Sequence, residues 1–224
     1  MGEKGEKGIA PVILPVIAVL AILLALACLD APCAERDPAA GNPPSRQSSE
    51  TENEVSYKIH VTIDGDTLSS IAGQSRIYGS SLKWTLIYLL NREELGKMKI
   101  QPAALPITPL PAGLVLALML PEEARKKADC AAEERPWVVN ILSSLNIEEI
   151  VPLAIRLIDG GYFAYIGQWN YKDKHWKRLR VGFFADRDTA NEQGRKIMEE
   201  LGLRNFWTVK ADWDELNEYA GFFE

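Results

Sequence analysis

The pattern of apolar and polar positions predicts a membrane-directed start to the chain. Residues 9–29 form a continuous apolar run without a charged residue, and Lys4 and Lys7 precede it. Such a run is long enough to cross a bilayer core of about 30 Å. We therefore expect residues 1–29 to be a signal peptide or a hydrophobic anchor helix. Residues 30–54 are rich in Pro, Ser and acidic residues, which predicts a disordered linker.

Residues 55–121 show the pattern of a small unit with strand, helix, helix and strand in that order. Tyr57, Ile59, Val61 and Ile63 alternate with polar residues, which predicts a half-buried strand. Helical spacing follows in residues 67–72 and 84–91, and a short apolar strand, residues 114–120, ends at a proline. We expect Asp66 to cap the first helix, and the core to contain Trp84, Ile87 and Tyr88.

A charged, Ala-rich connector, residues 122–135, separates this unit from a second one with a different pattern. In residues 136–210 the pattern predicts the order strand, helix, strand, strand, helix, strand. The expected elements are, in the same order, residues 137–142, 147–158, 162–168, 176–182, 189–201 and 206–209. Residues 211–224 remain as an acidic tail with aromatic residues.

Composition narrows the classes of function. The 224 residues include 25 Lys and Arg against 31 Asp and Glu, a net charge of -6, which argues against nucleic acid as a partner. The three cysteines lack the spacing of a zinc site, and His60 and His175 are the only histidines. Neither histidine lies near a nucleophile motif. We therefore expect no enzyme activity, no cofactor and no metal.

The first unit carries a set of short motifs at fixed offsets. They are GDTL at 65–68, IA at 71–72, IYG at 77–79, Trp84, IY at 87–88 and NR at 91–92. With these motifs residues 55–121 resemble a LysM domain. The resemblance implies a βααβ fold that binds N-acetylglucosamine-containing glycans between the loop after the first strand and the loop before the last. The glycan-binding residues that it implies are Gly65, Asp66, Thr67, Leu68, Pro109, Leu110 and Gly113.

The second unit carries WVVN at 137–140, GGYFAY at 160–165, WKRLRVGFF at 176–184 and DRDTA at 186–190. With these motifs residues 136–210 resemble a SPOR (sporulation-related repeat) domain. The resemblance implies an α+β fold, βαββαβ, whose four-stranded antiparallel sheet has both helices on one face. It also implies binding of peptidoglycan glycan strands that have lost their stem peptides.

Strand parity then predicts which side chains of the second unit meet the glycan. Leu179 and Val181 have one parity, whereas Trp176, Arg178 and Arg180 have the other. We expect the second group on the open face, where an aromatic ring stacks on a sugar and guanidinium groups donate hydrogen bonds. Asn140 and Ser143 complete the expected glycan-binding residues of this unit.

The end of the apolar run, LALAC at 24–28, resembles a bacterial lipoprotein signal peptide. The resemblance implies lipidation of Cys28. Two alternatives stay open, namely an uncleaved single-span anchor and ordinary secretion after cleavage at Ala25-x-Ala27. In each case both units leave the cytoplasm for the periplasmic side of a bacterial cell envelope. Whether Cys33 and Cys130 pair there is left open.

These features favour a non-catalytic peptidoglycan-binding envelope protein that is tethered to the membrane. Its expected partners are glycan strands and the membrane. An alternative is a targeting or regulatory subunit of a cell-wall hydrolase or synthase, recruited to division or remodelling sites. Such a subunit would bind its enzyme through the acidic tail, around Trp213, Tyr219, Phe222 and Phe223.

Overall fold

The computed structural model describes residues 57–128 and 135–223. The predictions for the signal or anchor, the linker, Cys28, Cys33 and Cys130 lie outside these residues. Within them, no helix combines the length and the apolar character that crossing a bilayer requires.

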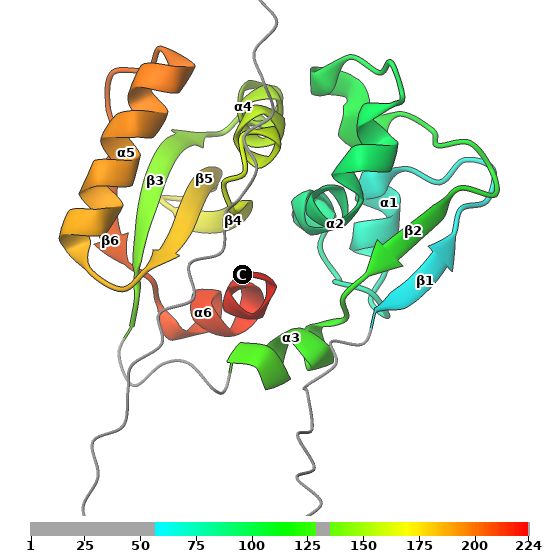
Figure 1. The fold of residues 1–224 in the computed structure, drawn as a ribbon, viewed down its shortest axis with the longest axis horizontal. Coiled ribbons are helices and arrows are strands. Elements are labelled where there is room, and N and C mark those ends of the chain that lie inside the picture. The colour runs from blue at the N-terminus through cyan, green and yellow to red at the C-terminus, as the bar shows by residue number, and fades with distance from the viewer. Residues whose placement is uncertain (1–56, 129–134, 224) are drawn as a thin grey trace, which may run out of the picture. The chain divides into compact units, whose positions relative to one another are not determined.

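The first part of the described chain has the predicted order of strand, helix, helix and strand (Figure 1). The two strands pair antiparallel. Trp84, Ile87 and Tyr88 are buried, as predicted. The elements are β1 (Lys58–Val61), α1 (Leu68–Gly73), α2 (Trp84–Gly96) and β2 (Val115–Leu118), with short 3-10 turns at Ser81–Lys83 and Pro102–Ile107.

One feature of this part is reversed from the prediction. The alternating residues Ile59, Val61 and Ile63 were expected to face the core, but all three are exposed. On the paired strand, Leu116 and Leu118 are buried instead, opposite the polar members of β1. The period of two is therefore present, but the apolar residues of β1 lie on the outer face.

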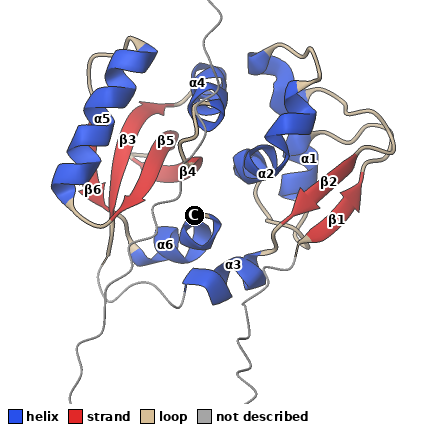
Figure 2. Ribbon diagram, viewed as in Figure 1, coloured by secondary structure: helices blue, strands red, loops and turns tan. Residues whose placement is uncertain are grey.

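The second part forms an antiparallel four-stranded sheet in the order β4-β5-β3-β6, which confirms the predicted fold class for this region. Helices α4 and α5 contact the strands from one side, as Figure 2 shows, through Ile150, Ala154 and Ile197 among others. The elements are β3 (Trp137–Ser144), α4 (Ile147–Asp159), β4 (Ala164–Tyr171), β5 (Lys174–Phe184), α5 (Arg187–Leu201) and β6 (Trp207–Lys210).

Local sequence fixes the ends of these helices. The side chains of Asn146 and Asp186 accept hydrogen bonds from the first turns of α4 and α5, because the first backbone amides of a helix have no partner within it. Helix α5 stops at Gly202, whose φ of 68° is in the left-handed region that suits glycine.

The connector was expected to be a short helical or frayed segment outside the core. It does contain a helix, α3 (Pro121–Ala128), but Ala124 of that helix is buried in the core. The acidic tail forms α6 (Trp213–Tyr219) and a 3-10 turn (Ala220–Phe222), and both pack against other elements. The tail is therefore part of the folded structure.

Candidate functional site

The sheet face opposite α4 and α5 carries the residues that the sequence pattern assigned to glycan binding. In the register, Arg180 is the partner of both Tyr165 and Asn140, and Arg178 is the partner of both Gly167 and Ser143. Leu179, between the two arginines, is buried toward the helices. The structure thus brings the predicted residues of β3 and β5 onto one face, and it adds residues of β4 to them.

The inner half of this face is covered, whereas the sequence pattern predicted an open face. Helix α6 lies over it, and the Glu215 carboxylate accepts two hydrogen bonds from the Arg180 guanidinium. The Tyr165 hydroxyl donates to Glu215 Oε1 at 2.7 Å. The Tyr219 ring stacks on the Tyr165 ring with the centroids 4.4 Å apart. Arg180 is only 8% exposed, and the Glu215 carboxylate neutralises its charge within the protein.

Asn140 is also inside rather than at the surface. It is fully buried, and its amide Nδ2 donates to Ser143 Oγ at 3.3 Å. Its Oδ1 and the Nε atoms of Arg178 and Arg180 are buried without a hydrogen-bond partner in the described part of the chain. Burying such groups costs free energy, so helix α6 covers this polar patch without satisfying all of its hydrogen-bonding groups.

The outer half of the face is exposed and holds a row of stacked side chains. The Arg178 guanidinium lies 3.7 Å from the centroid of the Trp169 ring. Trp169 in turn stacks on Tyr171, with centroids 4.9 Å apart and ring planes within 6°. Lys172 Nζ lies 5.2 Å from the centroid of the Tyr171 ring. We call these four residues the aromatic ladder. Trp176, one of the predicted residues, is half-buried and is the cross-strand partner of Trp169.

The sequence analysis missed Trp169 and Tyr171 because the strand was expected to end at residue 168. The signal was present, since Tyr165, Gly167, Trp169 and Tyr171 continue one alternation. With exposures of 38% and 48%, Trp169 and Tyr171 are among the most accessible aromatic residues of the described chain.

A hollow of about 240 Å³ lies between the ladder and α6. Its walls differ in charge. Trp169 and Arg178 form one wall, and the carboxylates of Asp212, Asp214 and Glu218 line the other. Burial and the neighbouring Arg180 lower the pKa of Arg178 from its ordinary value. An arginine stays protonated at neutral pH even so, and it can donate to an oxygen acceptor in the hollow.

Two of the four tail residues that were named for the alternative function are covered within the protein. Tyr219 and Phe222 are buried, because their rings pack on other aromatic rings. Trp213 remains exposed.

In the first part, the two loops that the LysM resemblance implied are in contact. The Leu110 amide donates to the Asp66 carbonyl oxygen at 2.7 Å. Gly65 and Gly113 are exposed and have φ of 85° and 84°, values that favour glycine. Pro109 is exposed too. Leu68 and Leu110 are buried, so their side chains belong to the core rather than to the surface of a groove.

Asp66 has a different role from the predicted helix cap. Thr67 caps α1, in a reciprocal pair of hydrogen bonds with Ser70. The Asp66 carboxylate accepts from the Ile63 amide at 3.1 Å and lies 3.0 Å from His60 Nε2. Burial raises the pKa of Asp66, but the hydrogen bonds from Ile63 and His60, together with the charges of His60 and Arg76, lower the pKa below its ordinary value. Asp66 therefore fastens the loop to β1.

Comparison with known families assigns the second part. The profile of the SPOR domain matches residues 133–208. The searches of curated proteins and of solved structures returned no match. A SPOR domain is thus present in this chain, and domains of this kind bind peptidoglycan, are not catalytic and occur in bacterial cell envelope proteins.

Proposed function

We propose that this chain is a non-catalytic peptidoglycan-binding envelope protein whose SPOR domain takes glycan strands without stem peptides on the outer half of its sheet face. The observation that carries the proposal is the exposed aromatic ladder beside the hollow, on the face that α4 and α5 leave free. Sugar rings present C–H bonds to aromatic side chains and hydroxyl groups to polar ones. The ladder and the carboxylates of α6 match both kinds of group.

The covered inner half supports an outer position for the glycan. Arg180 is bonded to Glu215, and Asn140 is inaccessible. Of the predicted glycan-binding residues, Trp176 and Arg178 reach the part of the face that remains open. A strand with stem peptides would be held away from this face, since each peptide adds bulk along the sugar chain. A strand without them can lie flat against it.

We also propose that the first part holds a glycan site of its own, in addition to the site in the SPOR domain. The order strand, helix, helix, strand and the contact between the two loops fit the LysM resemblance. With the N-terminal apolar run as tether, two weak sites on one chain would hold the membrane near the wall. Such an arrangement raises retention by about 10²-fold or more where the linker geometry permits both contacts.

We expect the full chain, kept in solution with a non-ionic detergent, to pellet with amidase-treated sacculi and much less with untreated sacculi. Trp176→Ala should weaken the pelleting several-fold, because one stacking contact is worth about 1 kcal/mol. Trp207→Ala is the matched control. Trp207 is also a tryptophan with an exposed face, but it lies in β6 at the opposite edge of the sheet. Equal pelleting with both kinds of sacculi, unchanged by Trp176→Ala or Arg178→Ala, would reject this face as the glycan site.

For the first part, chitooligosaccharide should shift the amide resonances of residues 65–68 in a saturable way. Gly65→Val should abolish the shift, because a side chain there prevents close approach of the sugar. Gly202→Val controls for backbone strain, since Gly202 also has a left-handed φ and open space around its Cα. If the control and Gly65→Val lose binding alike, or if no resonance moves in the unsubstituted chain, residues 65–68 do not bind glycan.

A further inference from the structure

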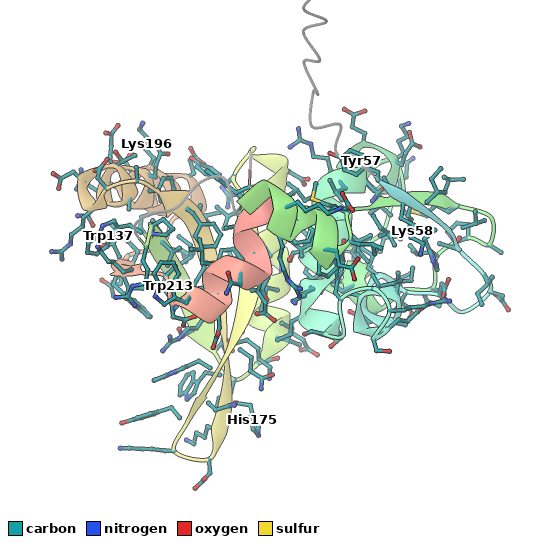
Figure 3. The ribbon with its side chains drawn as sticks, turned by 90° about the horizontal axis from the view of Figure 1, so that it is seen from below. Tyr57, Lys58, Trp137, His175, Lys196 and Trp213 are labelled. Carbon is teal, nitrogen blue, oxygen red and sulfur yellow. The ribbon has the colours of Figure 1, made fainter. Side chains whose placement is uncertain are left out.

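The β4–β5 hairpin concentrates positive charge in an acidic chain. Residues 169–178, which we call the arm, contain four cationic residues and one aspartate, giving a net charge of +3 with His175 neutral, whereas the whole chain carries -6. Figure 3 shows the end of the hairpin, marked by His175, extending away from the other elements of the second part. The pairing of β3 with β5 ends at Ser144 and Lys177. From there to the tip, the two strands of the arm pair only with each other. Lys172 and Lys174 are therefore exposed to the solvent, whereas Lys177 and Arg178 are half-buried.

Among the residues that the structure describes, the three lysines of the arm form no ion pair with a carboxylate, although several lysines elsewhere do. Lys83, Lys97, Lys196 and others of the described residues form ion pairs. In the described part of the chain, no carboxylate forms an ion pair with Lys172, Lys174 or Lys177. Lys177 donates to the Leu145 carbonyl oxygen, a neutral acceptor. Because this charge is not neutralised internally, the arm can attract an anion.

The aromatic ladder fixes two of these charges at the surface. Arg178 lies against Trp169, and Lys172 lies against Tyr171. Contacts of this kind orient a cation without neutralising it, since the ring is uncharged. The arm thus presents ordered positive groups beside flat apolar rings.

The tip of the arm retains backbone strain. Lys172 and Asp173 form the two-residue turn and have φ of 49° and 58°. Turns of this type favour Asn-Gly, because both central residues need positive φ. Strained backbone of this kind clusters at functional sites, and here one of the two strained residues is a lysine.

We propose that the arm recognises the lactyl carboxylates of glycan strands whose stem peptides have been removed. An amidase adds water across the amide that joins the peptide to muramic acid, so the peptide leaves with an ammonium group and the sugar keeps a carboxylate. Each trimmed muramic acid therefore gains a negative charge where an uncharged amide stood. The arm binds this negative charge, so that recognition depends on the charge as well as on the absence of the bulky stem peptide. This inference rests on the glycan-binding function proposed above.

Charge complementarity favours the trimmed strand over a lipid surface. A trimmed strand combines regularly spaced carboxylates with ring faces, and the arm combines cations with aromatic rings in one layer. A membrane surface would also attract lysines and aromatic residues. The trimmed strand contains sugar rings and the membrane surface does not, so lipid vesicles are included as a separate ligand in the test.

The experiment compares two preparations of the same amidase-trimmed glycan. In one, the lactyl carboxylates are converted to methylamides with a carbodiimide and methylamine, which removes the charge and adds little bulk. The full chain in detergent should bind the methylamide form about tenfold more weakly, and added salt should weaken binding to the free-carboxylate form only. Equal binding to both forms would overturn the proposal while leaving the glycan-binding function standing. Binding to neither form would remove that function, and the proposal with it.

Variants locate the effect in the arm. Lys172→Gln with Lys174→Gln should weaken binding to the free-carboxylate form about fivefold and leave the methylamide form unchanged, since exposed charge pairs are individually weak. Arg204→Gln, an exposed cation outside the arm, is the matched control and should have no effect. Asp173→Gly should strengthen binding, because it removes the one negative charge and suits the turn. An unchanged affinity in the double lysine variant would overturn the proposal, and so would arm-dependent binding to anionic phosphatidylglycerol vesicles without binding to glycan.

Discussion

The Trp84→Ala variant is expected to lower the free energy of unfolding by about 3–5 kcal/mol, the usual cost of removing a buried tryptophan. Trp84 is 1% exposed and is among the largest fully buried side chains of the described chain. Its ring lies at 59° to that of Tyr88, with centroids 6.3 Å apart. Alanine would leave a cavity at the start of α2, where Leu86 and Ile87 are also fully buried.

Denaturant unfolding followed by circular dichroism measures this loss. Trp207→Ala is the matched control, because Trp207 is 46% exposed and its removal leaves no internal cavity. We expect the control to change the free energy by less than about 1 kcal/mol. A comparable loss in both variants would mean that Trp84 is not part of a packed core.

The second large effect concerns the buried ion pair between α6 and the sheet. Arg180→Ala is expected to weaken the docking of α6 by about 3–5 kcal/mol, because it leaves the Glu215 carboxylate buried without its cation. The Tyr165 hydroxyl is the other group bonded to that carboxylate, and it carries no charge. Amide hydrogen exchange in residues 213–219 measures the docking and should accelerate strongly.

A double variant separates charge from packing. Arg180→Met with Glu215→Leu replaces the pair by apolar side chains of similar size, and such replacements are often neutral or stabilising. We expect this double variant to restore slow exchange in α6. If the single variant exchanged as slowly as the unsubstituted chain, the ion pair would not hold α6 in place.

The strands and helices of the SPOR domain could be predicted from the sequence, because the apolar residues of each element repeat with a clear strand or helix period. The sequence pattern also placed Trp176, Arg178 and Arg180 on one face, since parity needs no tertiary information. It did not find the cover over that face. The tail was interpreted by its acidic residues, although Leu216, Tyr219 and Phe222 follow one another at intervals of three. That Glu215 meets Arg180 depends on how α6 folds back, which a local pattern does not contain.

The reversal of β1 has a related cause. A period of two defines two faces but does not say which one meets the helices. Ile59 and Val61 make the odd positions the apolar face, yet the core is filled from β2 by Leu116 and Leu118. In a two-stranded sheet, one strand can supply the buried aliphatic residues for both.

The cover formed by α6 changes where the folding unit ends. The family match stops at residue 208, but the aromatic side of the sheet is completed only by residues up to Phe223, whose ring packs edge-on against Phe163 and Phe183. A shortened chain ending near residue 210 would leave Tyr165 and Phe183 uncovered, with a charged Arg180 between apolar rings. Such a patch promotes self-association. Soluble fragments of this domain therefore need to extend through the acidic tail.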